Sequence, residues 1–155
     1  MNVAIIGCGG MGRLHAEMAA NCGLRVTACA DIMRKAAMSA AVPHRAKVYA
    51  DPLGAIKSRE VDIVVIATPT PVHEKYVTAA ANARKHIFCE KPFGRSSDEC
   101  KRAIAVAKKA DVKLFVAHVV RYFHEFEAIR AQIKSGAIGE AGWVKLYRGG
   151  IYPGD

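Results

Sequence analysis

Short apolar runs alternate along the chain with longer stretches in which apolar positions recur every three or four residues. The runs are bounded by glycine, proline or charged residues, as is typical of strands that are buried on both faces of a parallel sheet. The longer stretches have the spacing of helices. Strands are predicted near Val3–Ile6, Arg25–Ala30, Lys47–Tyr49, Val61–Ala67, His86–Cys89 and Lys113–Ala117.

Helices are predicted between these strands. The first, about Met11–Cys22, places Leu14 and Met18 on one face and stops at Gly23, a residue that favours a helix C-terminus. The others are expected over Met33–Ala41 and Pro52–Lys57, from Thr70, from Ser96, and in a last helix that carries Phe126, Ile129 and Ile133 on one face and ends at Gly136.

Two helix starts carry capping signals. Thr70 is expected to be an N-cap with Pro71 at the first helical position. Ser96 and Glu99 have the spacing of a capping box, and Ile104 is among the residues expected to face inward.

The alternation predicts an α/β fold, a doubly wound parallel sheet of the Rossmann type, over residues 1–136. The tail breaks this pattern. Trp143–Arg148 alternates like a half-buried strand, and no later strand follows for it to pair with. We therefore expect residues 137–155 to be the start of a truncated second domain that binds substrate.

The bulk composition is that of a globular protein, and no apolar stretch reaches the length of a membrane span. The N-terminus has no secretory signal pattern. The cysteines lack paired metal-ligand spacing, so we expect reduced thiols in the cytoplasm and no metal site. They are Cys8, Cys22, Cys29, Cys89 and Cys100.

The formal charge of +9 raises nucleic-acid binding as a reading. The lysines and arginines are spread along the chain rather than clustered, which favours solvated helix faces instead. A positive field also suits a ligand that carries phosphates. Neither a nucleic acid nor a membrane is an expected partner.

A glycine-rich turn follows the first strand directly, with the sequence Gly7-Cys8-Gly9-Gly10-Met11-Gly12. In a dinucleotide-binding fingerprint the first glycine permits a tight turn and the second lets the backbone approach a diphosphate. The third lets the helix pack close to the strand, and the helix start offers free N–H groups. The position between a strand and a helix favours this interpretation over an ordinary glycine turn.

Asp31 ends the second strand, nineteen positions after Gly12, which is close to the spacing that the fingerprint requires. A carboxylate there accepts hydrogen bonds from ribose hydroxyls and repels a 2′-phosphate. We therefore predict NAD, with NADP less favoured, although Arg34 and Lys35 follow closely and could neutralise that phosphate.

Two further clusters follow the fourth and fifth strands, at the edge where such sheets bind ligands. They are Thr68-Pro69-Thr70-Pro71-Val72-His73 and Glu90-Lys91-Pro92. Together with the glycine turn and Asp31, they resemble the Gfo/Idh/MocA family of oxidoreductases, named for glucose–fructose oxidoreductase and inositol dehydrogenase. Arg121-Tyr122 also resembles the family's stretch after the sixth strand.

The resemblance implies a role for each residue. The loop Gly7–Gly12, including the backbone of Gly10 and Met11, would hold the diphosphate of NAD, and Asp31 the adenosine ribose. Glu90 would contact the nicotinamide ribose. The residues expected to line the rest of the cofactor pocket are Thr68, Pro69, His73, Pro92 and Arg121; for His73 and Arg121, a packed histidine and a structural ion pair are open alternatives.

Lys91 is the implied catalytic residue, beside a Lys91–Pro92 bond that is often cis in the family. A nearby ammonium stabilises the alkoxide that develops when a hydroxyl loses its proton and its carbon loses hydride. Two departures stand out. His124 occupies a position where the family often has proline, and the family's general base, a second-domain histidine, has no counterpart here, a role that His118 and His124 are not expected to fill.

The function expected is therefore the nucleotide-binding part of an oxidoreductase that transfers hydride between nicotinamide and a sugar or polyol carbon. The 155 residues alone are expected to be inactive. The alternative is a stand-alone NAD(P)-binding sensor without catalysis. Homo-oligomer formation stays open.

Overall fold

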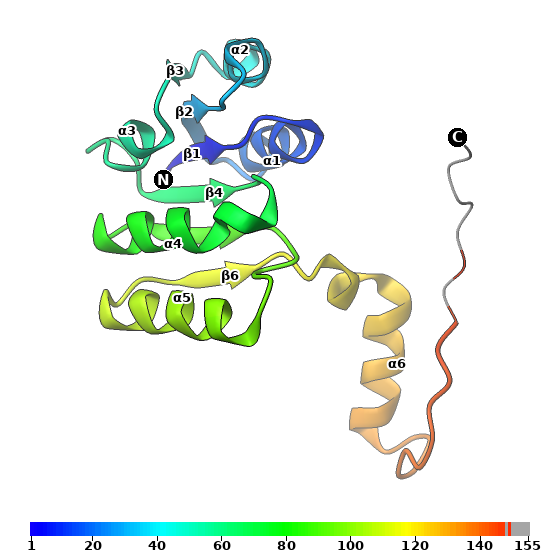
Figure 1. The fold of residues 1–155 in the computed structure, drawn as a ribbon. Helices are drawn as coiled ribbons and strands as arrows, with labels where there is room; N and C mark the ends of the chain where they lie inside the picture. Colours follow the sequence, from blue (N-terminus) through cyan, green and yellow to red (C-terminus); the bar gives the residue numbers. More distant parts are fainter. Residues whose placement is uncertain (148, 150–155) are drawn as a thin grey trace. The chain divides into compact units, whose positions relative to one another are not determined.

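The computed structural model describes residues 1–147 and 149 of the chain, which falls into two compact units, Met1–His118 and Val119–Asp155. The first unit is built on a six-stranded sheet (Figure 1). Every strand pairing in it is parallel. The strands are β1 (Asn2–Ile6), β2 (Arg25–Ala30), β3 (Lys47–Tyr49), β4 (Ile63–Ile66), β5 (His86–Cys89) and β6 (Leu114–Val116).

The strands lie in the order β3-β2-β1-β4-β5-β6, so the chain winds outward from β1 in one direction and then from β4 in the other. This order confirms the predicted doubly wound sheet. The reversal falls between β1 and β4, which are paired from Val3–Ile63 to Ile6–Ile66. Ligands of open α/β sheets bind at such a switch point, beyond the carboxyl ends of the strands.

Helices cover both faces of this sheet. Residues of α1 and α2 pack in one buried cluster with one set of strand side chains. Residues of α3, α4 and α5 pack in a second cluster with the other set. The bounds are α1 (Gly10–Asn21), α2 (Arg34–Ala41), α3 (Pro52–Ile56), α4 (His73–Asn82) and α5 (Ser97–Lys109), with short 3-10 turns η1 (Val42–His44) and η2 (Thr70–Val72).

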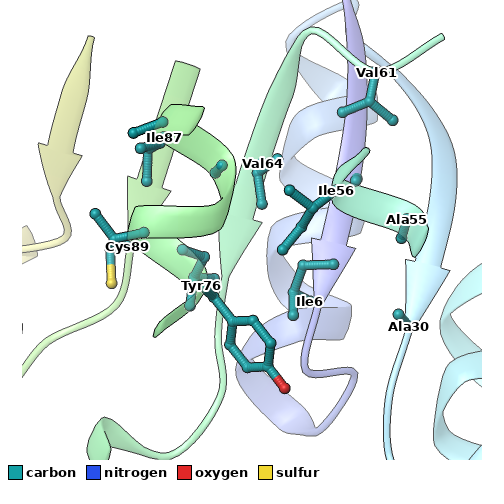
Figure 2. Packing of buried hydrophobic residues seen from close by; sticks show 14 of the residues in the cluster. Ile6, Ala30, Ala55, Ile56, Val61, Val64, Tyr76, Ile87 and Cys89 are labelled. Atoms are coloured by element: carbon teal, nitrogen blue, oxygen red, sulfur yellow. The ribbon is translucent and has the colours of Figure 1, made fainter. Parts of the chain in front are cut away.

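Strand β1 is buried on both faces, as its unbroken apolar sequence predicts. Val3 and Ile5 point to the cluster of α1 and α2, whereas Ala4 and Ile6 point to that of α3, α4 and α5. Figure 2 shows Ile6 in the second cluster, with Ile56 of α3 nearby. The site at the end of β1 therefore rests on the most buried strand of the sheet.

The face of α1 that carries Leu14 and Met18 is not its buried face. Leu14 and Met18 are 44% and 42% exposed, and the buried residues of the helix are Gly12 and Ala16. The helix lies so close to the sheet that only small side chains fit between them. Helix α5 behaves similarly: Ala103 is buried, whereas Ile104, expected inward, is exposed.

The two predicted caps have different outcomes. Thr70 is not the cap of α4, because Thr70–Val72 form a 3-10 turn and α4 begins only at His73, without a side-chain cap. The proline at position 71 fits the start of that turn instead. Ser96 does cap α5, since its hydroxyl accepts a hydrogen bond from the Glu99 amide at 3.2 Å.

The second unit begins with a 3-10 turn, η3 (Val119–Tyr122), and the helix α6 (His124–Ser135). Gly136 ends α6 with φ of 74°, which confirms the predicted stop. In the described part of the tail, Trp143–Tyr147 form no strand, because no neighbouring strand pairs with them there; Arg148 lies outside the described residues.

The division at residue 136 stays a prediction. No described helix has the length and apolar character that a membrane crossing requires.

The packing of α1 gives a first prediction. A Cβ atom at Gly12 would collide with the carbonyl oxygen of Gly7, whereas one at Gly10 would meet no atom within 4 Å. We expect Gly12→Ala to lower the free energy of unfolding by about 1–3 kcal/mol, as overpacking does. Gly10→Ala is the matched control and should stay within about 1 kcal/mol of the natural chain. Urea unfolding measures both, and equal stability of the two variants would contradict the close packing.

Candidate functional site

The loop after β1 is held in a conformation that requires glycine. Gly7 has φ of +86°, and a Cβ atom there would lie 2.7 Å from the carbonyl carbon of Ala67 at the end of β4. Its amide donates to the Ala30 carbonyl at 2.9 Å, which ties the loop to β2. The loop therefore crosses the switch point with its backbone pressed against both neighbouring strands.

The N-terminus of α1 opens at this loop. Gly9 is its N-cap residue, no side chain caps it, and its first turn carries no acidic residue. The first N–H groups of a helix lack intrahelical partners and carry the positive end of the helix dipole. An anion at this point would therefore meet several N–H donors and no competing carboxylate from the helix itself.

Asp31 lies beside the glycine loop, at the tip of β2. One carboxylate oxygen accepts a hydrogen bond from the Cys8 amide at 2.7 Å, and the other accepts from the Met33 amide at 2.7 Å. Each carboxylate oxygen accepts about two hydrogen bonds, so each keeps capacity for a hydroxyl group. The acid predicted to select the ribose thus also fixes the diphosphate loop in place.

Thr68 and His73 are joined at the end of β4. The Nε2 atom of His73 lies 2.8 Å from the Thr68 carbonyl oxygen, and the His73 side chain is buried. This favours the packed histidine that the sequence left open. Within residues 1–147 and 149, the Thr68 hydroxyl and His73 Nδ1 are buried without a hydrogen-bond partner. A buried hydroxyl without a partner is costly, which marks Thr68 as a candidate to bind a ligand.

A cavity of about 600 Å³ connects these features. Among the predicted site residues it is lined by Gly7, Gly9, Gly10, Met11, Asp31, Thr68 and Pro69. Gly12, His73, Glu90, Lys91 and Pro92 do not line it. Figure 2 shows Tyr76, a further lining residue from α4, with its ring beside Ile6 and its hydroxyl directed away from that side chain.

The sequence missed the apolar wall of this cavity. Ile32 and Met33 line it directly after Asp31 and are 93% and 65% exposed. Two adjacent apolar side chains that are exposed and line a cavity suit the flat face of a nucleotide base. The signal in the sequence that could have revealed this wall is the pair of consecutive apolar residues in the loop after β2.

The fifth-strand cluster lies at the tip of β5, next to β4, since the Glu90 amide donates to the Ile66 carbonyl at 2.9 Å. Lys91 is exposed, and the Lys91–Pro92 bond is cis, as the resemblance implies. Glu90 is buried, and its side chain lies 2.7 Å from Nε2 of His15, a residue that sequence reasoning did not single out. Arg121 lies in the second unit, and its role stays a prediction.

The cysteines near the site belong to the core. Cys8 and Cys29 are buried, and a hydrogen bond between their thiols raises the pKa of Cys29 and lowers that of Cys8. Cys8 is thus a packed side chain that fills the tight turn after β1. Burial, followed by the nearby Glu90 carboxylate, raises the pKa of Cys89 to about 12. All five cysteines are free thiols.

Residues 1–118 match the family described as an oxidoreductase family with an NAD-binding Rossmann fold. The chain belongs to the Gfo/Idh/MocA family. It is 34% identical over 158 residues to inositol 2-dehydrogenase 2 of Saccharopolyspora erythraea, a match that covers 99% of this chain and 47% of that protein. It is 31% identical over 149 residues to myo-inositol 2-dehydrogenase of Thermotoga maritima, covering 90% and 42% of the two chains.

Solved structures of Gfo/Idh/MocA proteins have the same fold. Myo-inositol 2-dehydrogenase from Lactobacillus plantarum matches with a TM-score of 0.82 and 26% identity, covering 90% of this chain and 42% of that one. The WlbA dehydrogenase from Bordetella pertussis, solved with NADH and UDP-GlcNAcA, matches in fold with a TM-score of 0.84 at 23% identity, covering 90% and 41%. The chain spans less than half the length of these relatives.

The residues of this Gfo/Idh/MocA domain fit NAD. The uncapped start of α1 suits a diphosphate, and the unpartnered Thr68 hydroxyl offers a buried polar contact in the same cavity. Asp31 has remaining acceptor capacity for ribose hydroxyls. The exposed apolar side chains of Ile32 and Met33 supply a wall for the base.

The double role of Asp31 gives a second prediction. Asp31→Ala leaves the Cys8 and Met33 amides without their acceptor, so we expect it to lower the free energy of unfolding by about 1–3 kcal/mol and weaken NADH binding about tenfold or more. Asp62→Ala is the control, because Asp62 accepts from the Asn2 amide at the opposite end of β1. It should leave the NADH affinity unchanged. Urea unfolding and fluorescence titration measure the two effects, and an equal loss of affinity in both variants would contradict this role.

Proposed function

We propose that the chain is the cofactor-binding part of an NAD-dependent dehydrogenase that oxidises a sugar or polyol hydroxyl. The observation that carries the proposal is the common cavity of the glycine loop, Asp31 and Thr68 at the switch point of the sheet. The inositol 2-dehydrogenases that the chain resembles support a polyol substrate. Five free thiols suit a reducing compartment, and we place the protein in the cytoplasm.

When bound, NAD supplies the acceptor for the hydride that leaves the carbinol carbon. The chain's own residues bind and orient it: the start of α1 meets the diphosphate, and Asp31 meets the adenosine ribose. Ile32 and Met33 shield the base from water. The place of these residues in the lining of the cavity supports the assignments.

Lys91 is the proposed catalytic residue on the substrate side. It is exposed at the carboxyl end of β5, and β5 is paired with β4, which ends at the cavity. Its ammonium would donate to the substrate oxygen and stabilise negative charge there as the hydroxyl proton leaves. None of the residues assigned to the site supplies the base that takes this proton.

The preference for NAD is the first test. Asp31 would lie near the 2′-phosphate of NADPH, and two like charges at such short range repel strongly. We expect isothermal titration calorimetry to give NADH an affinity at least about tenfold above that of NADPH, a difference of about 1.4 kcal/mol. Tighter binding of NADPH, through the neighbouring Arg34 and Lys35, would contradict the assignment. Failure to bind either dinucleotide would overturn the proposed function.

Turnover is the second test. With NAD and myo-inositol, the 155-residue chain is expected to form no NADH, because no assigned residue accepts the hydroxyl proton. Absorbance at the NADH wavelength measures this directly, with NADH binding by the same sample as the control for folding. Formation of NADH that depends on polyol and is lost in Lys91→Ala would show that the chain contains the missing base.

A further inference from the structure

We propose that His15 is a positioning residue for Lys91, acting through the carboxylate of Glu90. The inference rests on the proposed function, in which Lys91 is the catalytic residue. His15 lies on α1, three positions after Gly12, so it belongs to the helix whose start faces the cavity. Its Nε2 atom lies 2.7 Å from Oε1 of Glu90, across 75 positions of sequence.

The Glu90 carboxylate is held at both oxygens. While Oε1 faces His15, Oε2 accepts a hydrogen bond from the backbone amide of Lys91 at 3.0 Å. The main chain of Glu90 is fixed as well, through its amide bond to the Ile66 carbonyl. The carboxylate therefore connects a side chain of α1 to the backbone from which the Lys91 side chain extends.

The His15 ring is itself held in place. Its centroid lies 5.1 Å from that of Phe88 on β5, with an interplanar angle of 66°, an edge-to-face contact. Phe88 in turn stacks on Phe115 of β6 at 5.3 Å. The imidazole thus has little freedom to turn away from Glu90.

Burial makes the pair necessary. The side chains of His15 and Glu90 are 13% and 6% exposed. A carboxylate in so little contact with water is unfavourable without partners, so removal of His15 would drive Glu90 to reorient toward solvent. Because the Lys91 amide donates to the same carboxylate, the turn that carries the lysine would lose its anchor.

The consequence is a direct mechanical link between the two halves of the site. The helix that receives the diphosphate also fixes the segment that presents the ammonium, through His15 and Glu90. This role goes beyond the one that the family resemblance implies for Glu90, a contact with the nicotinamide ribose. Each Glu90 oxygen faces one partner within the protein and keeps capacity for a second hydrogen bond.

Amide hydrogen exchange of the 155-residue chain, followed by NMR, tests the link at one atom, the Lys91 amide. His15→Phe keeps an aromatic ring beside Phe88 but removes the nitrogen that faces Glu90. We expect it to speed exchange at Lys91 about tenfold, while the amides of Ile87 and Phe88 within β5 keep their natural rates. His15→Gln, which retains a hydrogen-bond donor, should keep exchange at the Lys91 amide as slow as in the natural chain. His44→Phe, at a histidine of η1, is the control and should have no effect.

A second background shows whether His15 acts through Glu90. In Glu90→Gln the side chain keeps its size but loses its charge, so His15→Phe should add little further change at Lys91. Two results would overturn the inference. One is a Lys91 exchange rate that is unchanged in His15→Phe. The other is an increase of that rate by His15→Phe that is equally large in the natural chain and in Glu90→Gln. Should His15→Phe fail to fold, His15→Ala takes its place: exchange at the Lys91 amide that is faster in His15→Ala than in His15→Gln supports the link, and equal rates in the two variants overturn it. NADH titration of the same samples reports on the proposed function separately.

Discussion

Gly12 packs against the carbonyl group of Gly7, and this backbone contact holds the first turn of α1 at the carboxyl end of β1. Any side chain at position 12 would push the helix away from the sheet. Because β1 is buried on both faces, the contact is built on the least deformable part of the molecule. The direction of the helix, the site of its free N–H groups and the reach of His15 toward Glu90 all depend on it.

Two carboxylates, one after β2 and one after β5, stabilise the position of α1 and its glycine loop on the sheet. Asp31 accepts amide hydrogen bonds from the glycine loop and from the segment before α2, which fixes the loop relative to β2. Glu90 contacts α1 through His15 and the turn after β5 through Lys91. Both acids therefore hold together segments distant in sequence, and a substitution at either would change geometry as well as a direct ligand contact.

The sequence was sufficient for the strands, their parallel arrangement and the half of the site built from the glycine turn and Asp31. Those features have local signals: apolar runs, glycines at fixed spacing and an acid at a strand tip. Which face of α1 is buried did not follow from the sequence, because close approach to the sheet selects Gly12 and Ala16 over the larger Leu14 and Met18. That preference comes from interhelical and helix–sheet distance, which the periodicity of one helix does not contain.

The pairing of His15 with Glu90 had no local signal at all. The two residues meet only because the sheet order places β4 beside β1 and β5 beside β4, so that the tip of β5 comes near α1. Thr68 was identified from its motif, but no sequence pattern indicates that its hydroxyl is buried without a hydrogen-bond partner.

The central claim is that the start of α1 receives a diphosphate. A direct measurement is an NMR titration that follows the backbone amides of Gly9, Gly10 and Met11 with NADH, ADP-ribose and adenosine in turn. The account predicts large chemical-shift changes for these amides with NADH and ADP-ribose, which carry a diphosphate. It predicts small changes with adenosine, which lacks one. The account would be contradicted if NADH binding left the chemical shifts of these amides unchanged and changed those of amides on another surface.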